Sequence, residues 1–108
     1  MNTIELAGKT YKVDDEGFLF SEDFGEWKEE FAQAYANSEG IEGPLTEDHW
    51  KVIYYLRDYY QKLGIVPMVR KLCKETGMDM KRFSALFTAS PVKEACKISG
   101  IPKQAGCV

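Results

Sequence analysis

The most informative stretch of this chain of 108 residues is residues 45–64, LTEDHWKVIYYLRDYYQKLG. Thr46 is a good N-cap, Glu47 and Asp48 suit the positive end of a helix dipole, and Gly64 is a typical helix stop. Between these ends, apolar and aromatic residues recur at helical spacing: Ile53, Leu56, Tyr60 and Leu63, with Tyr54, Tyr55 and Tyr59 beside them. The pattern predicts a helix over about 46–63 whose apolar face belongs to a core.

Shorter elements are predicted on both sides of this helix. Alternating apolar residues around the turn at Gly8 indicate a β-hairpin, and the next turn is DDEG at residues 14–17. Helical spacing, Pro67 and Pro91 as first-turn residues and Asp79 as an N-cap predict the remaining helices. The hairpin is expected over about 3–19, and these helices over about 26–38, 67–76, 79–87 and 91–99.

The expected fold class is mainly α. It is a small orthogonal helical bundle that contains a helix-turn-helix and carries an N-terminal β-hairpin and a flexible C-terminal arm. Two strands alone are marginally stable, so the hairpin must pack on the helices. We expect residues 1–100 to form a single domain and residues 101–108 to form a mobile arm.

The chain gives no sign of a membrane span or an export signal. The longest uncharged apolar run is five residues, 65–69, whereas a span needs about 20. The N-terminus, MNTIE, lacks the basic and apolar regions of a signal peptide. We therefore expect a cytoplasmic protein without membrane insertion.

Charge is distributed unevenly along the chain. The net charge is −3, but residues 1–50 contain 3 Lys or Arg against 13 Asp or Glu, while residues 51–108 contain 11 against 4. One interpretation is a surface that steers a charged partner. The other is that the two halves fold together and compensate each other.

The predicted helix-turn-helix has basic outward positions, namely Arg70, Lys71, Lys74, Lys81 and Arg82. A DNA-binding regulator is therefore one hypothesis. Solvated lysines on paired helices are also common in proteins that never bind DNA, so the alternative is an ordinary polar face.

The cysteines favour neither a disulfide framework nor zinc. Three are present, an odd number, without a C-x-x-C pair, and the single histidine, His49, lies 24 residues before the nearest of them. Cys73 fits a buried position on its helix. Cys107, the penultimate residue, is either a reactive thiol or an incidental exposed one.

Cys96 lies near the end of the helix predicted at 91–99, on a face that also fits core packing. Fully extended, the seven residues from Ile101 to Cys107 span about 24 Å, enough slack for the two Cα atoms to reach the disulfide range of about 4.4–6.8 Å. Lys93 favours a thiolate at Cys96, whereas the negative helix end opposes it.

The C-terminal sequence, from Pro91-x-Lys93-x-Ala95-Cys96 to KISGIPKQAGCV at 97–108, closely resembles the DsrC family, which includes the TusE sulfur-relay proteins. Supporting motifs are Val13-Asp14-x-x-Gly17-Phe18-Leu19, Leu45-Thr46-x-x-His49, and Tyr59-Tyr60 followed by Gly64-Ile65-x-Pro67-Met68-Val69-Arg70. Residues 90–94 look more firmly helical than the glycine-rich segment that is common in the family.

The resemblance implies a sulfur-carrying redox co-substrate of dissimilatory sulfite reductase, not a stand-alone catalyst. Cys107 would take up a partly reduced sulfur and form a trisulfide or disulfide with Cys96, in sulfite reduction or in reverse sulfur oxidation. We expect Lys93, Lys97, Lys103 and Arg70 to support the thiols or the partner contact.

The implied partners are the α and β subunits of the reductase, a membrane-linked heterodisulfide-reductase-like complex and sulfur-relay donors, with nucleic acid as a minor one. We expect no cofactor on this chain, and siroheme and an iron–sulfur cluster in the reductase. The main alternative is a TusE-like sulfurtransferase that relays persulfide for tRNA thiolation. Relatives of that type are expected to keep only the penultimate cysteine, whereas this chain has both.

Overall fold

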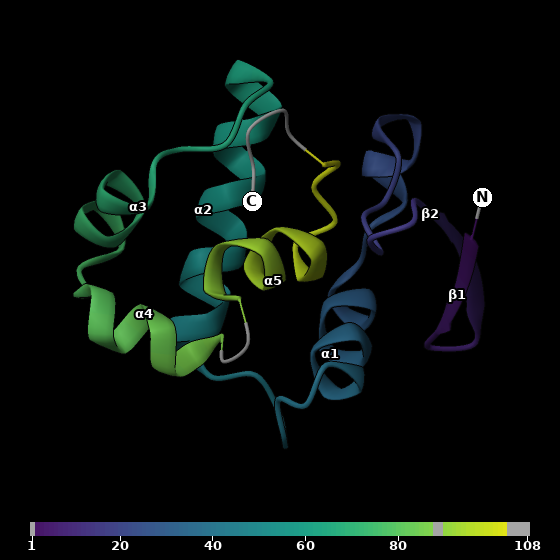
Figure 1. Ribbon diagram of the computed structural model, residues 1–108, viewed down its shortest axis with the longest axis horizontal. Coiled ribbons are helices and arrows are strands. Elements are labelled where there is room, and N and C mark those ends of the chain that lie inside the picture. Colours follow the sequence, from purple (N-terminus) through teal and green to yellow (C-terminus); the bar gives the residue numbers. More distant parts are fainter. Residues whose placement is uncertain (1, 88–89, 104–108) are drawn as a thin grey trace.

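The computed structural model describes residues 2–87 and 90–103, and its fold is mainly helical with an N-terminal hairpin, as predicted (Figure 1). Strands β1 (Asn2–Leu6) and β2 (Lys9–Val13) pair antiparallel, with Asn2 opposite Val13 and Leu6 opposite Lys9. Leu6, Tyr11 and Val13 are buried. The hairpin therefore leans on the helices, as expected for a two-stranded sheet.

Helix α2 (Glu47–Leu63) confirms the central prediction. The Thr46 side chain accepts a hydrogen bond from the His49 backbone N–H, and the Thr46 backbone N–H donates to His49 Nδ1 at 3.0 Å. These two bonds form a capping box. At the other end, Gly64 adopts φ 72°, a left-handed conformation that stops the helix as predicted.

The helix-turn-helix consists of α3 (Val69–Thr76) and α4 (Met80–Leu86), joined by a turn that starts at Gly77. The Asp79 carboxylate caps α4 by accepting the Arg82 N–H at 2.8 Å. The prediction that Pro67 opens α3 is wrong. Pro67 is buried before the helix and Met68 stays extended (ψ 148°), so α3 begins two residues later.

The helix predicted over 26–38 begins later than expected. A short 3₁₀ helix, η1 (Ser21–Glu26), comes first, and α1 spans Glu29–Ser38. Trp27 lies between them in an extended conformation (ψ 141°). The Trp27 indole N–H donates a hydrogen bond to the carbonyl of Ile98, which lies 71 residues later in the sequence. Local helical spacing does not indicate this contact.

Helix α5 (Pro91–Ile98) lies across α2 at the centre of the molecule (Figure 1) and packs against α1, α2 and α4. Residues from every element except η1 contribute buried side chains to one apolar cluster, in which Phe18, Phe31, Phe83 and Phe87 are fully enclosed. Burial of such aromatic side chains supplies a large share of the folding free energy. Within the described part of the chain, none of the helices is long and apolar enough to cross a membrane.

His49, the only histidine, joins the beginning of α2 to the end of α4. Its ring is buried, Nδ1 accepts the Thr46 N–H, and Nε2 donates to the Leu86 carbonyl at 2.9 Å. These partners require the neutral ring. Burial lowers the pKa of His49 below its ordinary value.

We predict that the free energy of unfolding falls as the pH drops through the ordinary histidine range near 6.5. The lowered pKa means that the unfolded chain takes up the proton first, so the stabilisation is complete above that range and is lost below it. Urea unfolding at about pH 7.5 and about pH 5.5 measures the difference. His49→Gln should lose about 1–2 kcal/mol at the higher pH and most of the pH slope. An unchanged slope in this variant would contradict the assignment.

Candidate functional site

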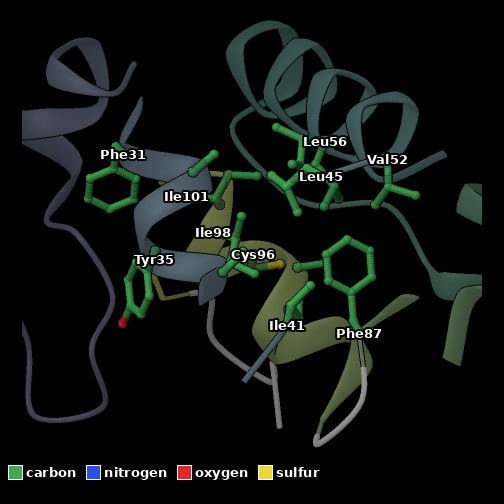
Figure 2. Close-up of a cluster of buried hydrophobic side chains, with 14 of the residues drawn as sticks. Phe31, Tyr35, Ile41, Leu45, Val52, Leu56, Phe87, Cys96, Ile98 and Ile101 are labelled. Carbon is green, nitrogen blue, oxygen red and sulfur yellow. The ribbon is translucent and has the colours of Figure 1, made fainter. Parts of the chain in front are cut away.

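The candidate site is built around the last turn of α5. Pro91 occupies the first turn, where its missing N–H is harmless, so the segment before Cys96 is helical as its sequence indicated. Ala95, Cys96 and Ile98 are buried, and Cys96 is only 1% exposed. Figure 2 shows the Cys96 side chain among the apolar residues of the core cluster. The core-packing interpretation of this face is therefore correct.

The chain reverses direction immediately after α5. Gly100 adopts φ 70°, the Gly100 N–H donates to the Lys97 carbonyl at 3.1 Å, and the Ile101 N–H donates to the Cys96 carbonyl at 3.0 Å. This pair of bonds is the Schellman arrangement, which ends the helix and satisfies two of its last carbonyls. Ile101 is fully buried and Pro102 is buried. The first residues of the predicted mobile arm are thus packed on the body.

Trp27 holds this reversal in place. Its Nε1–H donates to the Ile98 carbonyl at 2.9 Å, and its ring lies directly against Gly100. A Cβ atom at position 100 would lie 2.6 Å from Trp27 Cδ1. Glycine is therefore required here both by the left-handed backbone and by the close approach of the indole.

Arg57 secures the same end of α5 from helix α2. Its guanidinium donates to the Ser99 carbonyl at 2.8 Å and to the Phe24 carbonyl at 3.0 Å. The guanidinium carbon lies 4.0 Å from the Phe24 ring centre and 4.2 Å from the Trp27 ring centre. Burial lowers the pKa of Arg57 to about 10, so the group stays charged at neutral pH. A cation here also suits the negative end of the α5 dipole.

Three of the four predicted supporting residues form ion pairs with the acidic N-terminal half. Lys103 Nζ lies 2.6 Å from a Glu16 oxygen, Lys93 Nζ lies 3.5 Å from the other Glu16 oxygen, and Lys97 Nζ lies 2.6 Å from a Glu39 oxygen. Around Cys96, the charge asymmetry is therefore compensated internally.

The fourth predicted supporting residue, Arg70, is exposed on α3. Among the described residues it forms no ion pair, and neither do Lys71, Lys74 and Lys81. Arg82 differs, because it binds the Asp48 carboxylate at 2.8 Å. The structure thus does not join Arg70 to the α5 lysines, and it leaves an outward positive face on α3 and α4. Nucleic-acid binding there stays a prediction.

A cavity of about 300 Å³ lies beside α5. Its lining carries three carboxylates against two ammonium groups, and is made by Glu16, Glu39, Ser90, Lys93, Glu94 and Lys97. A formally negative lining is unsuited to an anion such as sulfite. In the described part of the chain, no group of three or more His, Cys, Asp or Glu is arranged to hold a metal ion.

Of the other two cysteines, Cys73 lies among the described residues and Cys107 does not. Cys73 is buried as predicted, its Sγ donates to Met80 Sδ at 3.7 Å, and burial raises the pKa of its thiol. It is therefore a packing residue. Cys107 and the rest of residues 104–108 lie outside the described residues.

The sequence interpretation missed four residues that build this site: Glu16, Trp27, Glu39 and Arg57. Arg57 carried a detectable signal, because a charged residue follows Ile53 at helical spacing on an otherwise apolar face of α2. The acidic residues carried none, since a carboxylate in a turn is ordinarily solvated.

Fold and site together define a small helical protein with a hairpin, a helix-turn-helix and a buried cysteine at the point where its C-terminal segment turns back. The model for the family described as DsrC like protein matches residues 5–108. The chain belongs to the DsrC-like family.

Curated relatives carry two kinds of name. The chain is 44% identical over 108 residues to the dissimilatory-type sulfite reductase subunit gamma of Nitratidesulfovibrio vulgaris, covering 100% of both chains. It is 36% identical over 112 residues to a TusE sulfurtransferase homolog of Haemophilus influenzae, with 97% of this chain and 99% of the relative covered. A chain in the crystal structure of dissimilatory sulfite reductase I (DsrI) is 45% identical, with a TM-score of 0.86 over 99% of this chain and 100% of that chain.

We predict that Gly100→Ala destabilises the protein by more than about 2 kcal/mol, because it combines an unfavourable left-handed backbone with a clash against Trp27. Urea unfolding measures the loss. Gly64→Ala is the matched control, since Gly64 also has a left-handed φ of 72° but has no atom within 4 Å of an added Cβ. That control should lose about 1 kcal/mol, the cost of a left-handed backbone for an L-residue. Equal losses in the two variants would contradict the role of the indole.

We also predict that Cys96 and Cys73 are alkylated by iodoacetamide at least about 100-fold more slowly in the folded protein than in urea, because opening of a packed core limits access. Peptide mass spectrometry of timed samples resolves each cysteine. Rapid labelling of Cys96 in the folded protein would contradict its burial in solution.

Proposed function

We propose that this protein is a sulfur carrier that works as a co-substrate of dissimilatory sulfite reductase, with Cys107 and Cys96 as the sulfur-handling pair. The observation that carries the proposal is the chain reversal at Gly100. It bonds the Ile101 N–H to the Cys96 carbonyl, so the segment that continues to Cys107 begins beside the helix turn that holds Cys96.

Burial of Cys96 supports an intramolecular role for this thiol. At 1% exposure its sulfur is shielded from dissolved thiols and oxidants. A sulfur brought by the same chain has the advantage of proximity, because closure of a short loop has a small entropic cost. Cys96 is thus suited to react with a sulfur held on Cys107 in preference to one from solution.

The charge around the site supports a carrier that lacks its own substrate pocket. The formally negative cavity beside α5 does not suit sulfite, and on this proposal the anion is bound and reduced by the partner. The names of the N. vulgaris relative and of the DsrI structure support a sulfite reductase as that partner. The cofactors of the reduction then belong to the reductase, and the carrier contributes thiols.

The proposed sulfur transfer balances as follows. Sulfur at the +2 level, written as sulfoxylic acid, combines with the two thiols and releases two waters, which leaves a trisulfide between Cys96 and Cys107. Four electrons and four protons from a reducing complex then release hydrogen sulfide and restore both thiols. Thiolate attack on sulfur is the elementary step throughout. In sulfur oxidation the carrier works in the opposite direction.

A TusE-like sulfurtransferase is the second candidate, and the match to the H. influenzae relative favours it. Such a relay passes a persulfide sulfur from one cysteine to the next protein. It needs Cys107 alone, so the requirement for Cys96 separates the two functions.

We predict that incubation with a dissimilatory sulfite reductase, sulfite and an electron donor converts the protein to a species heavier by one sulfur atom less two hydrogen atoms, the signature of a trisulfide. Intact-mass spectrometry detects it. Cys107→Ser should abolish the species, and Cys96→Ser should abolish the trisulfide while permitting a persulfide on Cys107. Absence of any adduct on the wild type would reject the carrier function. Sulfur transfer to a relay acceptor that is unaffected by Cys96→Ser would favour the sulfurtransferase.

A further inference from the structure

We propose that Glu16 is a positioning residue for the arm, defined as residues 101–108: its carboxylate binds Lys103 and holds the beginning of the arm on the body, which favours reaction between Cys107 and Cys96. The proposal rests on the carrier function proposed above. It adds an attachment of the arm to the body, the Glu16–Lys103 ion pair, which we call the latch.

Glu16 is part of a rigid turn. The Asp14 carboxylate accepts the backbone N–H groups of Glu16 at 2.9 Å and Phe18 at 3.0 Å, and the Gly17 N–H donates to the Asp14 carbonyl at 3.0 Å. The Gly17 carbonyl accepts the Tyr35 hydroxyl at 2.6 Å, and Phe18 is fully buried. These bonds fix the backbone that presents Glu16, so the turn is a firm anchor for a lysine.

The same carboxylate holds two lysines from different parts of the chain. Lys103 binds Oε1 at 2.6 Å, and Lys93 on α5 lies 3.5 Å from Oε2. If Lys103 leaves, Glu16 retains Lys93 and the carboxylate is not left unpaired. Release of Lys103 from Glu16 therefore has a small electrostatic cost, which suits a latch that opens and closes.

Lys103 is well placed to control the reach of the arm. It follows Ile101, whose N–H bonds to the Cys96 carbonyl, by two residues, and it precedes Cys107 by four. Four residues span at most about 14 Å. On this proposal, binding of Lys103 to the turn limits how far Cys107 can lie from that attachment, and we expect this limit to raise the effective concentration of Cys107 at Cys96.

The latch is an ion pair exposed to solvent, so dissolved salt can weaken it. The side chains of Lys103 and Glu16 are 44% and 38% exposed. The hydrogen bond from Lys103 lowers the pKa of the Glu16 carboxyl, which keeps it ionised at neutral pH. Mobile ions screen such an exposed pair strongly at high ionic strength.

The test is the equilibrium of the Cys96–Cys107 disulfide with glutathione buffers. One protein thiolate attacks oxidised glutathione and releases one glutathione thiolate, the second protein thiolate displaces another, and the two protons pass to these products. Intact-mass spectrometry after acid quenching gives the oxidised fraction and hence the effective concentration of the thiol pair. The comparison is made at about 0.05 M and about 1 M KCl.

We expect Glu16→Gln and Lys103→Gln each to lower the effective concentration at low salt by about two- to fivefold, the range typical of exposed ion pairs. The double variant should match the single variants, and Lys103→Arg should restore the wild-type value. High salt should lower the wild-type value to that of Glu16→Gln and leave the variant unchanged. Glu42→Gln, which removes an exposed carboxylate from the α1–α2 connection, is the matched control and should behave as wild type.

The outcomes separate the latch from the carrier function. If the wild type forms the disulfide and Glu16→Gln has the same effective concentration and salt dependence, the latch is wrong and the carrier function stands. If the wild type forms no Cys96–Cys107 disulfide in any buffer, the thiol pair itself fails. Additive losses in the double variant would show that the two residues act separately and would also overturn the latch.

Discussion

The chain reversal after α5 is the feature on which the rest of the site depends. Three separate segments meet there, because Trp27 from the η1–α1 junction and Arg57 from α2 both donate to carbonyls at the end of α5. The indole occupies the space that any side chain at position 100 would need. This arrangement satisfies carbonyls that a helix end normally leaves unpaired, and it sets the direction of the chain towards Cys107.

Carboxylates of the acidic N-terminal half form ion pairs with basic residues around the site. Glu16 and Glu39 reach α5 and the arm, and Asp48 binds Arg82 on α4. The uneven charge along the chain is thus partly an internal complementarity, with the remaining positive face on α3 and α4. These pairs join α5, α4 and Lys103 to the acidic half without a partner protein.

The helices and the burial of the two described cysteines were largely predictable, because each follows from local pattern. The Thr46 cap, the Gly64 stop and the Asp79 cap appear as expected, and burial of Cys73 followed from its helical spacing. The errors have a common origin. Helix α1 starts late because Trp27 is extended towards α5, and α3 starts late because Pro67 is buried ahead of it. In both places the tertiary environment, a distant hydrogen bond at Trp27 and burial at Pro67, overrides a local preference.

From composition and spacing alone, one obtains a small helical protein with a hairpin and two cysteines near its C-terminus, since helix caps, glycine stops and apolar periodicity act over a few residues. The tertiary structure alone determines that Gly100 is enclosed by an indole and that Glu16 binds Lys103 across 87 positions of sequence. Pairings of this kind depend on how the elements pack, and no local pattern in the chain encodes them.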